Sequence, residues 1–226
     1  MTIQFLGQNC FLFEVEGQTI LSDPFYNYQK NKSGFSIENT PIDYILITHG
    51  HQDHIADVKE VLEHYPEATI IGQPEICAYF GAKNFIDINL GGSAKLKDLK
   101  LTMVPAQHTS SFPDGSYAGV AAGYIFRFSD RNLYFAGDTG VMADMALFPK
   151  LYGAIDTAIL PIGSHYTMCA KKASFAAKEL IECSRVIGCH FDTFPPIEIN
   201  HEEAKAAFNE KGVDLILPKV GEKISF

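Results

Sequence analysis

Short apolar runs separated by turn-forming residues open the chain, a pattern typical of β-strands. The runs at 3–6, 10–15 and 19–22 are joined by links of hairpin length. We therefore predict three antiparallel strands at the start of the fold. The polar stretch at 27–40 that follows contains lysine, serine and glycine and predicts a loop, which we interpret as a mobile flap over a site.

Further along, apolar runs alternate with segments whose apolar residues lie three and four positions apart. Such alternation predicts strands interleaved with helices. The predicted strands are 44–47, 69–72, 85–88, 99–104, 119–128, 133–136, 157–160, 185–188, 215–217 and 223–225, and the predicted helices are 55–65, 74–80, 143–151, 170–183 and 202–210. Pro74 suits a first helical position, and Asn200 suits a helix cap. Since no linker or repeat divides the pattern, we predict one mixed α+β or α/β domain over residues 1–226.

Polar residues with metal-binding side chains interrupt this pattern directly after the strand predicted at 44–47. His49, His51, Asp53 and His54 fall within six residues, at a turn from a buried strand to a helix. Open α/β sheets place their sites at such strand ends. The alternative is a solvated polar turn with a chance cluster, which the density of ligand-type residues disfavours. The spacing therefore indicates a metal site.

Three more candidate ligands each follow an apolar strand. His108 comes after the strand at 99–104, Asp138 after 133–136 and His190 after 185–188. Taken alone, each has a simpler reading as a loop histidine or a turn-forming aspartate, but the repeated placement favours side chains that project from one edge of a sheet. Imidazole and carboxylate suit zinc, and also manganese or iron. We predict two divalent metal ions per chain, about 3.5–4 Å apart, holding a hydroxide at neutral pH.

Composition limits the partners. The net charge is −9, with 18 Lys and Arg against 27 Asp and Glu, which disfavours a surface built for nucleic acid. The first residues lack a secretory pattern, and no apolar run approaches the roughly 20 residues of a membrane span. Five cysteines without a C-x-x-C pair indicate reduced thiols. We expect a cytoplasmic protein with a small-molecule substrate. The composition is compatible with a homo-oligomer.

Taken together, these motifs resemble the metallo-β-lactamase superfamily. The segment THGHQDH matches its H-x-H-x-D-H signature, and AQHTSS, FAGDTG and the segment around His190 follow in the family's order. The segments LGQNCFLFE, LSDPF, GDTGVMADM, PIGSHYTM and HFDTFP resemble its small single-domain branch of metal-dependent hydrolases. That branch is similar to the ascorbate-6-phosphate lactonase group.

The resemblance implies a four-layer αββα sandwich, with two mixed β-sheets flanked by helices and metals at one edge. It also implies a ligand set: His49, His51 and His108 for one metal, Asp53, His54 and His190 for the other, and Asp138 as the bridge. Asp53 would in addition orient the hydroxide, and zinc is the first choice of metal. Asp23 and Asp57 are expected to support the ligands, with Asp57 orienting the motif.

Two segments depart from the branch. Gln8 stands where the branch has a histidine, and Met168-Cys169-Ala170 replaces its Met-Gly-Pro. We expect Gln8 to contact the substrate. His165, in the PIGSH turn, is expected to contact the substrate or to protonate the leaving group, the alternative being a surface loop histidine.

The leading functional prediction is a hydrolase that cleaves an ester, lactone or related bond in a small substrate, with or without a phosphate group. One alternative is a metal-dependent phosphodiesterase acting on a small molecule, lipid or nucleotide. A diiron oxidoreductase of this fold typically carries a glutamate at the position of His51, which favours hydrolysis. A non-catalytic metal-binding protein is the third alternative, disfavoured because all seven predicted ligands are present.

Overall fold

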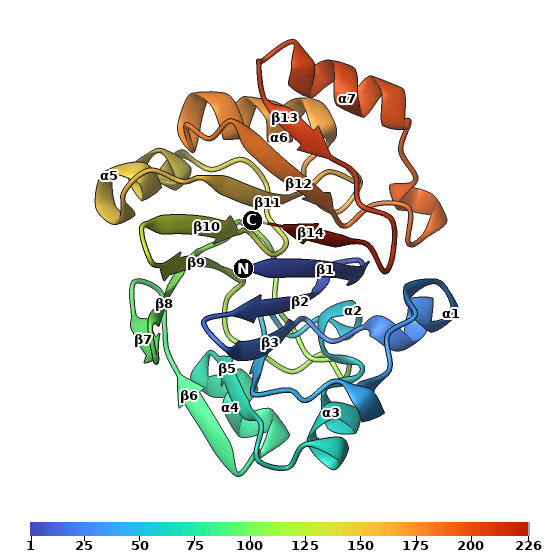
Figure 1. Ribbon diagram of the computed structural model, residues 1–226, viewed down its shortest axis with the longest axis vertical. Coiled ribbons are helices and arrows are strands. Elements are labelled where there is room, and N and C mark those ends of the chain that lie inside the picture. The colour runs from blue at the N-terminus through green and yellow to red at the C-terminus, as the bar shows by residue number, and fades with distance from the viewer. Residues whose placement is uncertain (226) are drawn as a thin grey trace.

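Two seven-stranded mixed β-sheets form the centre of the protein (Figure 1). The computed structural model describes residues 1–225, leaving aside the side chain of Lys30. The first sheet has the order β14 (Lys223–Ser225), β1 (Thr2–Gly7), β2 (Cys10–Val15), β3 (Gln18–Ser22), β4 (Tyr44–Leu46), β5 (Thr69–Gly72) and β6 (Asn84–Asp87). The second has the order β13 (Asp214–Ile216), β12 (Arg185–Cys189), β11 (Thr157–Pro161), β10 (Arg131–Phe135), β9 (Ala122–Phe128), β8 (Leu99–Pro105) and β7 (Ser93–Leu96).

Each sheet is antiparallel in one half and parallel in the other. In the first sheet the strands from β14 to β3 are antiparallel, and those from β3 to β6 are parallel. In the second, β7 to β10 are antiparallel and β10 to β13 are parallel. The antiparallel opening of three strands predicted from the sequence is confirmed.

Aromatic side chains fill the space between the two sheets. Phe13 of β2 packs against Phe126 of β9 with ring centroids 4.9 Å apart, and Phe11 meets Phe135 of β10 edge-on at 6.0 Å. All four rings are buried. Because side chains alternate along a strand, the opposite faces of both sheets need covers of their own.

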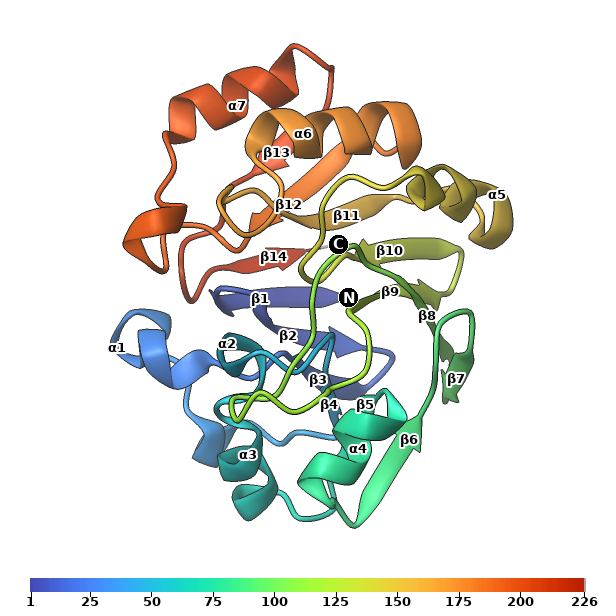
Figure 2. The same cartoon turned by 180° about the vertical axis from the view of Figure 1, so that it is seen from behind.

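Helices provide these covers on both outer faces (Figures 1 and 2). The first sheet is covered by α3 (Val58–His64) and α4 (Pro74–Phe80), and the second by α5 (Phe148–Tyr152), α6 (Ala170–Phe175) with its π-helical continuation η4 (Ala176–Leu180), and α7 (His201–Asn209). The remaining short helices are α1 (Lys30–Ser33), α2 (Gln52–Ile55), η1 (Tyr26–Gln29), η2 (Ile37–Asn39), η3 (Ala143–Leu147) and η5 (Pro195–Ile197). The predicted four-layer αββα sandwich is confirmed.

Local helix signals in the sequence also have their expected effect. Pro74 begins α4, and Gly81 ends it in the left-handed conformation, with φ +59°. The Asn200 side chain accepts hydrogen bonds from the backbone N–H groups of Glu202 and Glu203 at the start of α7.

Several predicted boundaries are wrong for identifiable reasons. The helix predicted at 55–65 is split, because the N–H of Asp57 donates to the carbonyl oxygen of Pro24 instead of continuing the helix. The helix at 170–183 widens into the π-helical η4, where the N–H of Ile181 reaches Ala176. β9 begins at Ala122 rather than at 119, since Gly119 has φ +76°.

The segment 27–40, predicted as a mobile loop over the site, is instead folded into short helices. Phe35 and Ile37 are buried against the outer face of the first sheet, and the Tyr65 hydroxyl donates to the Ile37 carbonyl at 2.7 Å. Residues 27–40 contribute no described side chain to the wall of the site cavity. The prediction of a loop is therefore wrong, while a mobile flap stays a prediction.

No helix within residues 1–225 is both long enough and apolar enough to cross a membrane.

Candidate metal centre

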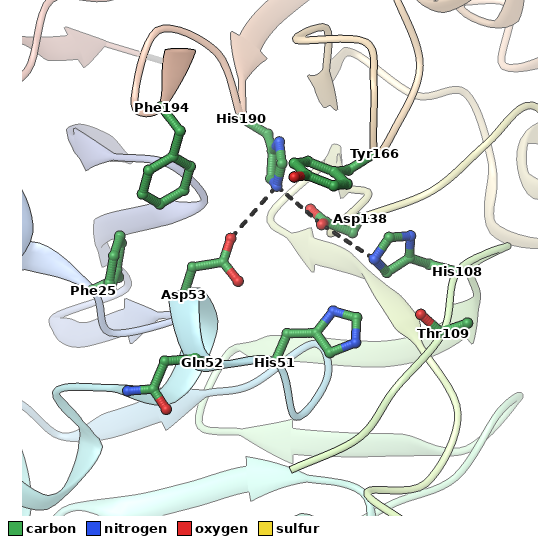
Figure 3. Close-up of a pocket in the computed structure, with 10 residues that line it drawn as sticks. All are labelled: Phe25, His51, Gln52, Asp53, His108, Thr109, Asp138, Tyr166, His190 and Phe194. Atoms are coloured by element: carbon green, nitrogen blue, oxygen red, sulfur yellow. Dashed lines mark ion pairs between the residues drawn. The ribbon is translucent and has the colours of Figure 1, made fainter. Parts of the chain in front are cut away.

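Loops that leave the ends of strands from both sheets meet at one edge of the sandwich. His49 and His51 follow β4, and Asp53 and His54 lie on α2 directly behind them. The other three predicted ligands follow strands of the second sheet: His108 after β8, Asp138 after β10 and His190 after β12. The structure brings all seven side chains together, and Figure 3 shows five of them around one cavity.

Their donor atoms form three overlapping groups, each with all atoms within 4.8 Å of one another. The groups are His49, His51 and His108; Asp53, His54 and His190; and His49, His54 and Asp138. Asp138 lies between the first two groups: its Oδ2 is 3.0 Å from His190 Nε2, 3.5 Å from His108 Nε2 and 3.6 Å from His54 Nε2. One oxygen of Asp138 therefore lies close to a histidine of each of the first two groups.

A glycine allows the loop that carries His108 to lie against the H-x-H-x-D-H turn. A Cβ atom at Gly50 would be 2.3 Å from the Cβ of Ala118. The Gly50 N–H donates to Ser110 Oγ at 3.2 Å, and Ser110 in turn donates to the Ala118 carbonyl at 3.0 Å. The loop 106–121 therefore closes directly on the turn, which brings His108 of the second sheet to His49 of the first.

Asp23, at the end of β3, fixes the orientation of two imidazoles. Its buried carboxylate accepts a hydrogen bond from His54 Nδ1 at 2.7 Å, and others from the Thr48 hydroxyl at 2.7 Å and the Thr48 N–H at 2.8 Å. Because the Thr48 hydroxyl donates its hydrogen to Asp23, its oxygen accepts a hydrogen bond from His49 Nδ1 at 3.0 Å. Nε2 of both histidines is then left as a donor atom for a cation. His54 Nε2 is buried and has no hydrogen-bond partner.

Gln8 and Asn9, in the turn between β1 and β2, hold the two carboxylates. Gln8 Nε2 donates to Asp53 Oδ2 at 2.7 Å, and the Gln8 carbonyl accepts from the His190 N–H at 3.0 Å. Asn9 Nδ2 donates to Asp138 Oδ1 at 2.7 Å. Gln8 is fully buried, with φ +54°, so it lies behind Asp53 rather than on the cavity wall. Its predicted contact with substrate stays a prediction.

Charge in the cluster divides along the two donor groups. Burial lowers the pKa of His49, His51 and His108, which keeps these imidazoles neutral. Burial alone would also lower the pKa of the other two histidines. However, Asp53 and Asp138 beside His54 raise its pKa well above the usual value, and Asp138 beside His190 raises that pKa to about 9.

The carboxylates show the converse shifts. Burial alone would raise the pKa of Asp53 and of Asp138, but the adjacent His54 and His190 hold both well below the usual range. Both carboxyl groups are therefore ionised across the neutral range. Without a cation, the protons on His54 and His190 balance this negative charge.

A cavity of about 560 Å³ opens onto the cluster. Besides the candidate ligands, its wall includes Phe25, Tyr166, Phe194, Gln52 and Thr109. The three aromatic residues were missed by the sequence interpretation, although LSDPF, PIGSHYTM and HFDTFP contain them. Their position shortly after a strand end was the available signal.

Other predicted residues take different places. His165 is exposed, and its ring lies 4.5 Å from that of Tyr166, which does line the cavity. Asp57 accepts a hydrogen bond from the Asn27 N–H at 2.8 Å, and Asp23 rather than Asp57 contacts the imidazoles. Cys189, one of the five cysteines of the chain, is buried between the sheets, and burial raises the pKa of its thiol well above the usual value.

Residues 2–190 match the family model of the β-lactamase superfamily domain. The chain belongs to this superfamily. It is 43% identical over 227 residues to a metal-dependent hydrolase from Christiangramia forsetii, with 99% of each chain covered. A metal-dependent hydrolase from Methanopyrus kandleri is 39% identical, covering 95% of this chain and 94% of the relative.

A solved structure agrees with this membership of the β-lactamase superfamily. A metallo hydrolase from Ignicoccus hospitalis superposes with a TM-score of 0.84 at 32% sequence identity, covering 100% of this chain and 97% of that one. The chain is thus a metal-dependent hydrolase with the metallo-β-lactamase fold.

Proposed function

We propose that this hydrolase binds two divalent cations at the candidate metal centre and cleaves an ester, lactone or related bond in a small molecule. One observation carries the proposal: two three-donor groups lie on either side of Asp138, beneath a single cavity. A volume of about 560 Å³ suits a substrate of the size of a metabolite.

The residues fit two such cations. His49, His51 and His108 would hold one, Asp53, His54 and His190 the other, and Asp138 would bridge them. The unpartnered Nε2 of buried His54 supports this assignment, because a buried donor atom without a partner is costly unless a ligand takes it. Nitrogen-rich donors with few carboxylates favour zinc, while manganese and iron are compatible.

When bound, two such cations supply a hydroxide at neutral pH and polarise the bond under attack. The remaining work belongs to the chain. Asp53 lines the cavity and, held by Gln8, orients the attacking water. Asp138 keeps the two donor groups in register, because Asn9 fixes its other oxygen.

We assign protonation of the leaving group to the turn that carries His165 and Tyr166. His165 is the predicted proton donor, and Tyr166 presents a hydroxyl on the cavity wall. The variants His165→Ala and Tyr166→Phe separate the two roles: the true donor loses kcat at unchanged metal content, whereas the other residue does not.

The test is metal analysis combined with turnover. Protein purified without added metal is expected to hold about two cations per chain and to hydrolyse lactones, esters or thioesters in a panel that also contains phosphodiesters. Asp138→Asn should lower kcat/KM by about a hundredfold or more while leaving the fold intact, because it weakens the bridge. Asp114→Asn, on an exposed turn of the same loop that carries His108, is the matched control.

A fully active protein without bound metal would contradict the two-cation centre. Retained activity in Asp138→Asn would remove Asp138 as the bridge. A protein that holds two cations but cleaves only phosphodiesters in the panel would contradict the proposed bond type.

A further inference from the structure

Three aromatic rings pack together beside the candidate metal centre, and two of them line its cavity. Phe25 stacks on Tyr28 with ring centroids 5.1 Å apart and an interplanar angle of 14°. Phe194 completes the group at 5.1 Å from Tyr28 and 6.1 Å from Phe25. We call Phe25, Tyr28 and Phe194 the aromatic triad. Phe25 and Phe194 line the cavity, and Figure 3 shows both rings on the side of the cavity next to Asp53.

The triad is positioned by the same loops that shape the metal centre. Phe25 comes two residues after Asp23, which holds His54, and Phe194 comes four residues after His190. Asp23, His190 and Asp192 all have positive φ, at +37°, +53° and +55°, so both loops turn sharply out of their strands. Asp192 is itself tied down, because its Oδ1 accepts from the Ile199 N–H at 2.9 Å. The rings are therefore held at a fixed place relative to the reacting centre.

The described cavity wall offers no Lys or Arg side chain to a negative substituent. Its charged side chains, apart from the histidines, are Asp53 and Asp138, which are candidate metal ligands. A phosphate group on the substrate is bound well where Arg or Lys side chains or several backbone N–H groups face it. Aromatic rings form no hydrogen bonds that replace those between water and a phosphate, whereas they pack well on another flat apolar group.

From these contacts we propose that the substrate carries an aromatic or similarly flat apolar group next to the scissile bond. Phe25 and Phe194 of the triad bind this group, and Tyr28 supports both rings. The inference rests on the proposed function, and it chooses among the substrates which that function leaves open. It selects an ester or lactone with an apolar substituent over one with a phosphate.

Matched lactones test the choice of substituent. Three γ-lactones that differ only in one group, benzyl, methyl or phosphorylated hydroxymethyl, present the same scissile bond. We expect kcat/KM for the benzyl lactone to exceed that for the methyl lactone about tenfold or more, and the phosphorylated lactone to be the poorest substrate. Equal rates for benzyl and methyl, or a preference for the phosphorylated lactone, would overturn the inference.

Single-ring variants locate the effect. Phe25→Leu and Phe194→Leu keep an apolar side chain but remove the ring, so each should lower kcat/KM for the benzyl lactone several-fold and leave the methyl lactone within about twofold. Phe85→Leu, at an exposed phenylalanine on β6, is the matched control and should change neither. Equal losses on both lactones would indicate a disturbed centre and would contradict a substituent-binding role.

Binding can be measured apart from turnover, because the chain contains no tryptophan. Phe194→Trp places a single fluorophore in the triad, Phe25→Trp provides a second reporter should the first fold poorly, and Phe85→Trp is the control. The probe is 2-benzyltetrahydrofuran, which resembles the benzyl lactone but has no bond to hydrolyse. Its addition should change the emission of the triad reporters and leave that of the control unchanged.

The two measurements fail separately. A probe that binds the triad in a protein without hydrolytic turnover would overturn the proposed function while the aromatic site stands. Turnover of the lactones without an emission change in either triad reporter would overturn the aromatic site while the proposed function stands.

Discussion

At the scale of single residues, the orientation of His54 depends on a carboxylate far away in the sequence. Asp23 is buried and accepts hydrogen bonds from His54 Nδ1 and from both polar groups of Thr48. With Nδ1 as the donor, Nε2 faces the centre, where a cation can bind it by displacing its proton. We therefore propose that Asp23 positions His54 for metal binding without itself contacting the cation.

Replacing Asp23 by asparagine should weaken metal binding by about 10- to 100-fold. Both carboxylate oxygens now accept hydrogen bonds, from His54 and Thr48, and an amide NH₂ in place of either oxygen would face a donor. The measurement is competition for zinc with a chelator of known affinity. Asp43→Asn is a matched control, since exposed Asp43 accepts a hydrogen bond from the Thr19 N–H at 2.8 Å, away from the cavity. Equal affinities in wild type and Asp23→Asn would show that the carboxylate does not set the orientation.

Single residues also show which parts of the site the sequence can predict. The seven candidate ligands were found because their types and spacing are written in short segments that follow apolar runs. The hydrogen bond from Gln8 to Asp53 was not predicted. It joins residues 45 positions apart and depends on how the β1–β2 turn packs against α2. The same holds for Phe25 and Phe194, which meet only in the folded chain.

At the scale of elements, the sequence predicts strands and helices well where local residues alone determine them. The hydrophobic pattern located the strands that carry the candidate ligands, and Asn200 began α7 as expected. β7 was missed because only Ala94 and Leu96 mark its buried face. The break in the helix at 55–65 was missed because it arises from a tertiary hydrogen bond, Asp57 to Pro24.

A tertiary contact between elements also controls how His108 reaches the centre. Gly50→Ala would place a Cβ 2.3 Å from that of Ala118, so the loop 106–121 must move away from the H-x-H-x-D-H turn. We expect a loss of stability of about 1–3 kcal/mol from overpacking. The cation assigned to His49, His51 and His108 should also bind more weakly, giving fewer than two metals per chain. Denaturant unfolding and metal analysis measure the two effects.

Removing the opposing methyl group provides the matched rescue. Gly50→Ala with Ala118→Gly should recover much of the lost stability and metal content, because the 2.3 Å contact disappears. Gly140→Ala is the neutral comparison, since a Cβ there would lie 3.3 Å from its nearest neighbour, the flexible side-chain oxygen of Gln107. A double variant as poor as Gly50→Ala would show that this contact does not control the loop.

At the scale of the whole molecule, the metal centre links the stability of the sandwich to pH. Histidines in an unfolded chain titrate near pH 6.5. Because the pKa of His190 is raised to about 9, its stabilising contribution is complete below about pH 6.5 and is lost as pH rises towards 9. His54, whose pKa is also raised, acts in the same direction. His49, His51 and His108 have lowered pKa values, so they reduce stability as pH falls below about 6.5.

The metal-free protein should therefore be most stable near pH 6.5 and lose stability on the alkaline side, whereas the metal-loaded protein should not. Bound cations take the place of the protons on His54 and His190, so raising the pH to 9 removes no favourable charge from the loaded centre.

The difference in Tm between loaded and metal-free protein should widen steadily from pH 6.5 to 9, and zinc binding at pH 7 should release protons. Thermal unfolding across this range, with and without a chelator, measures the difference, and calorimetry in buffers of different ionisation enthalpy counts the protons. A constant difference in Tm with no proton release would contradict a centre in which cations and protons compete for the same imidazoles.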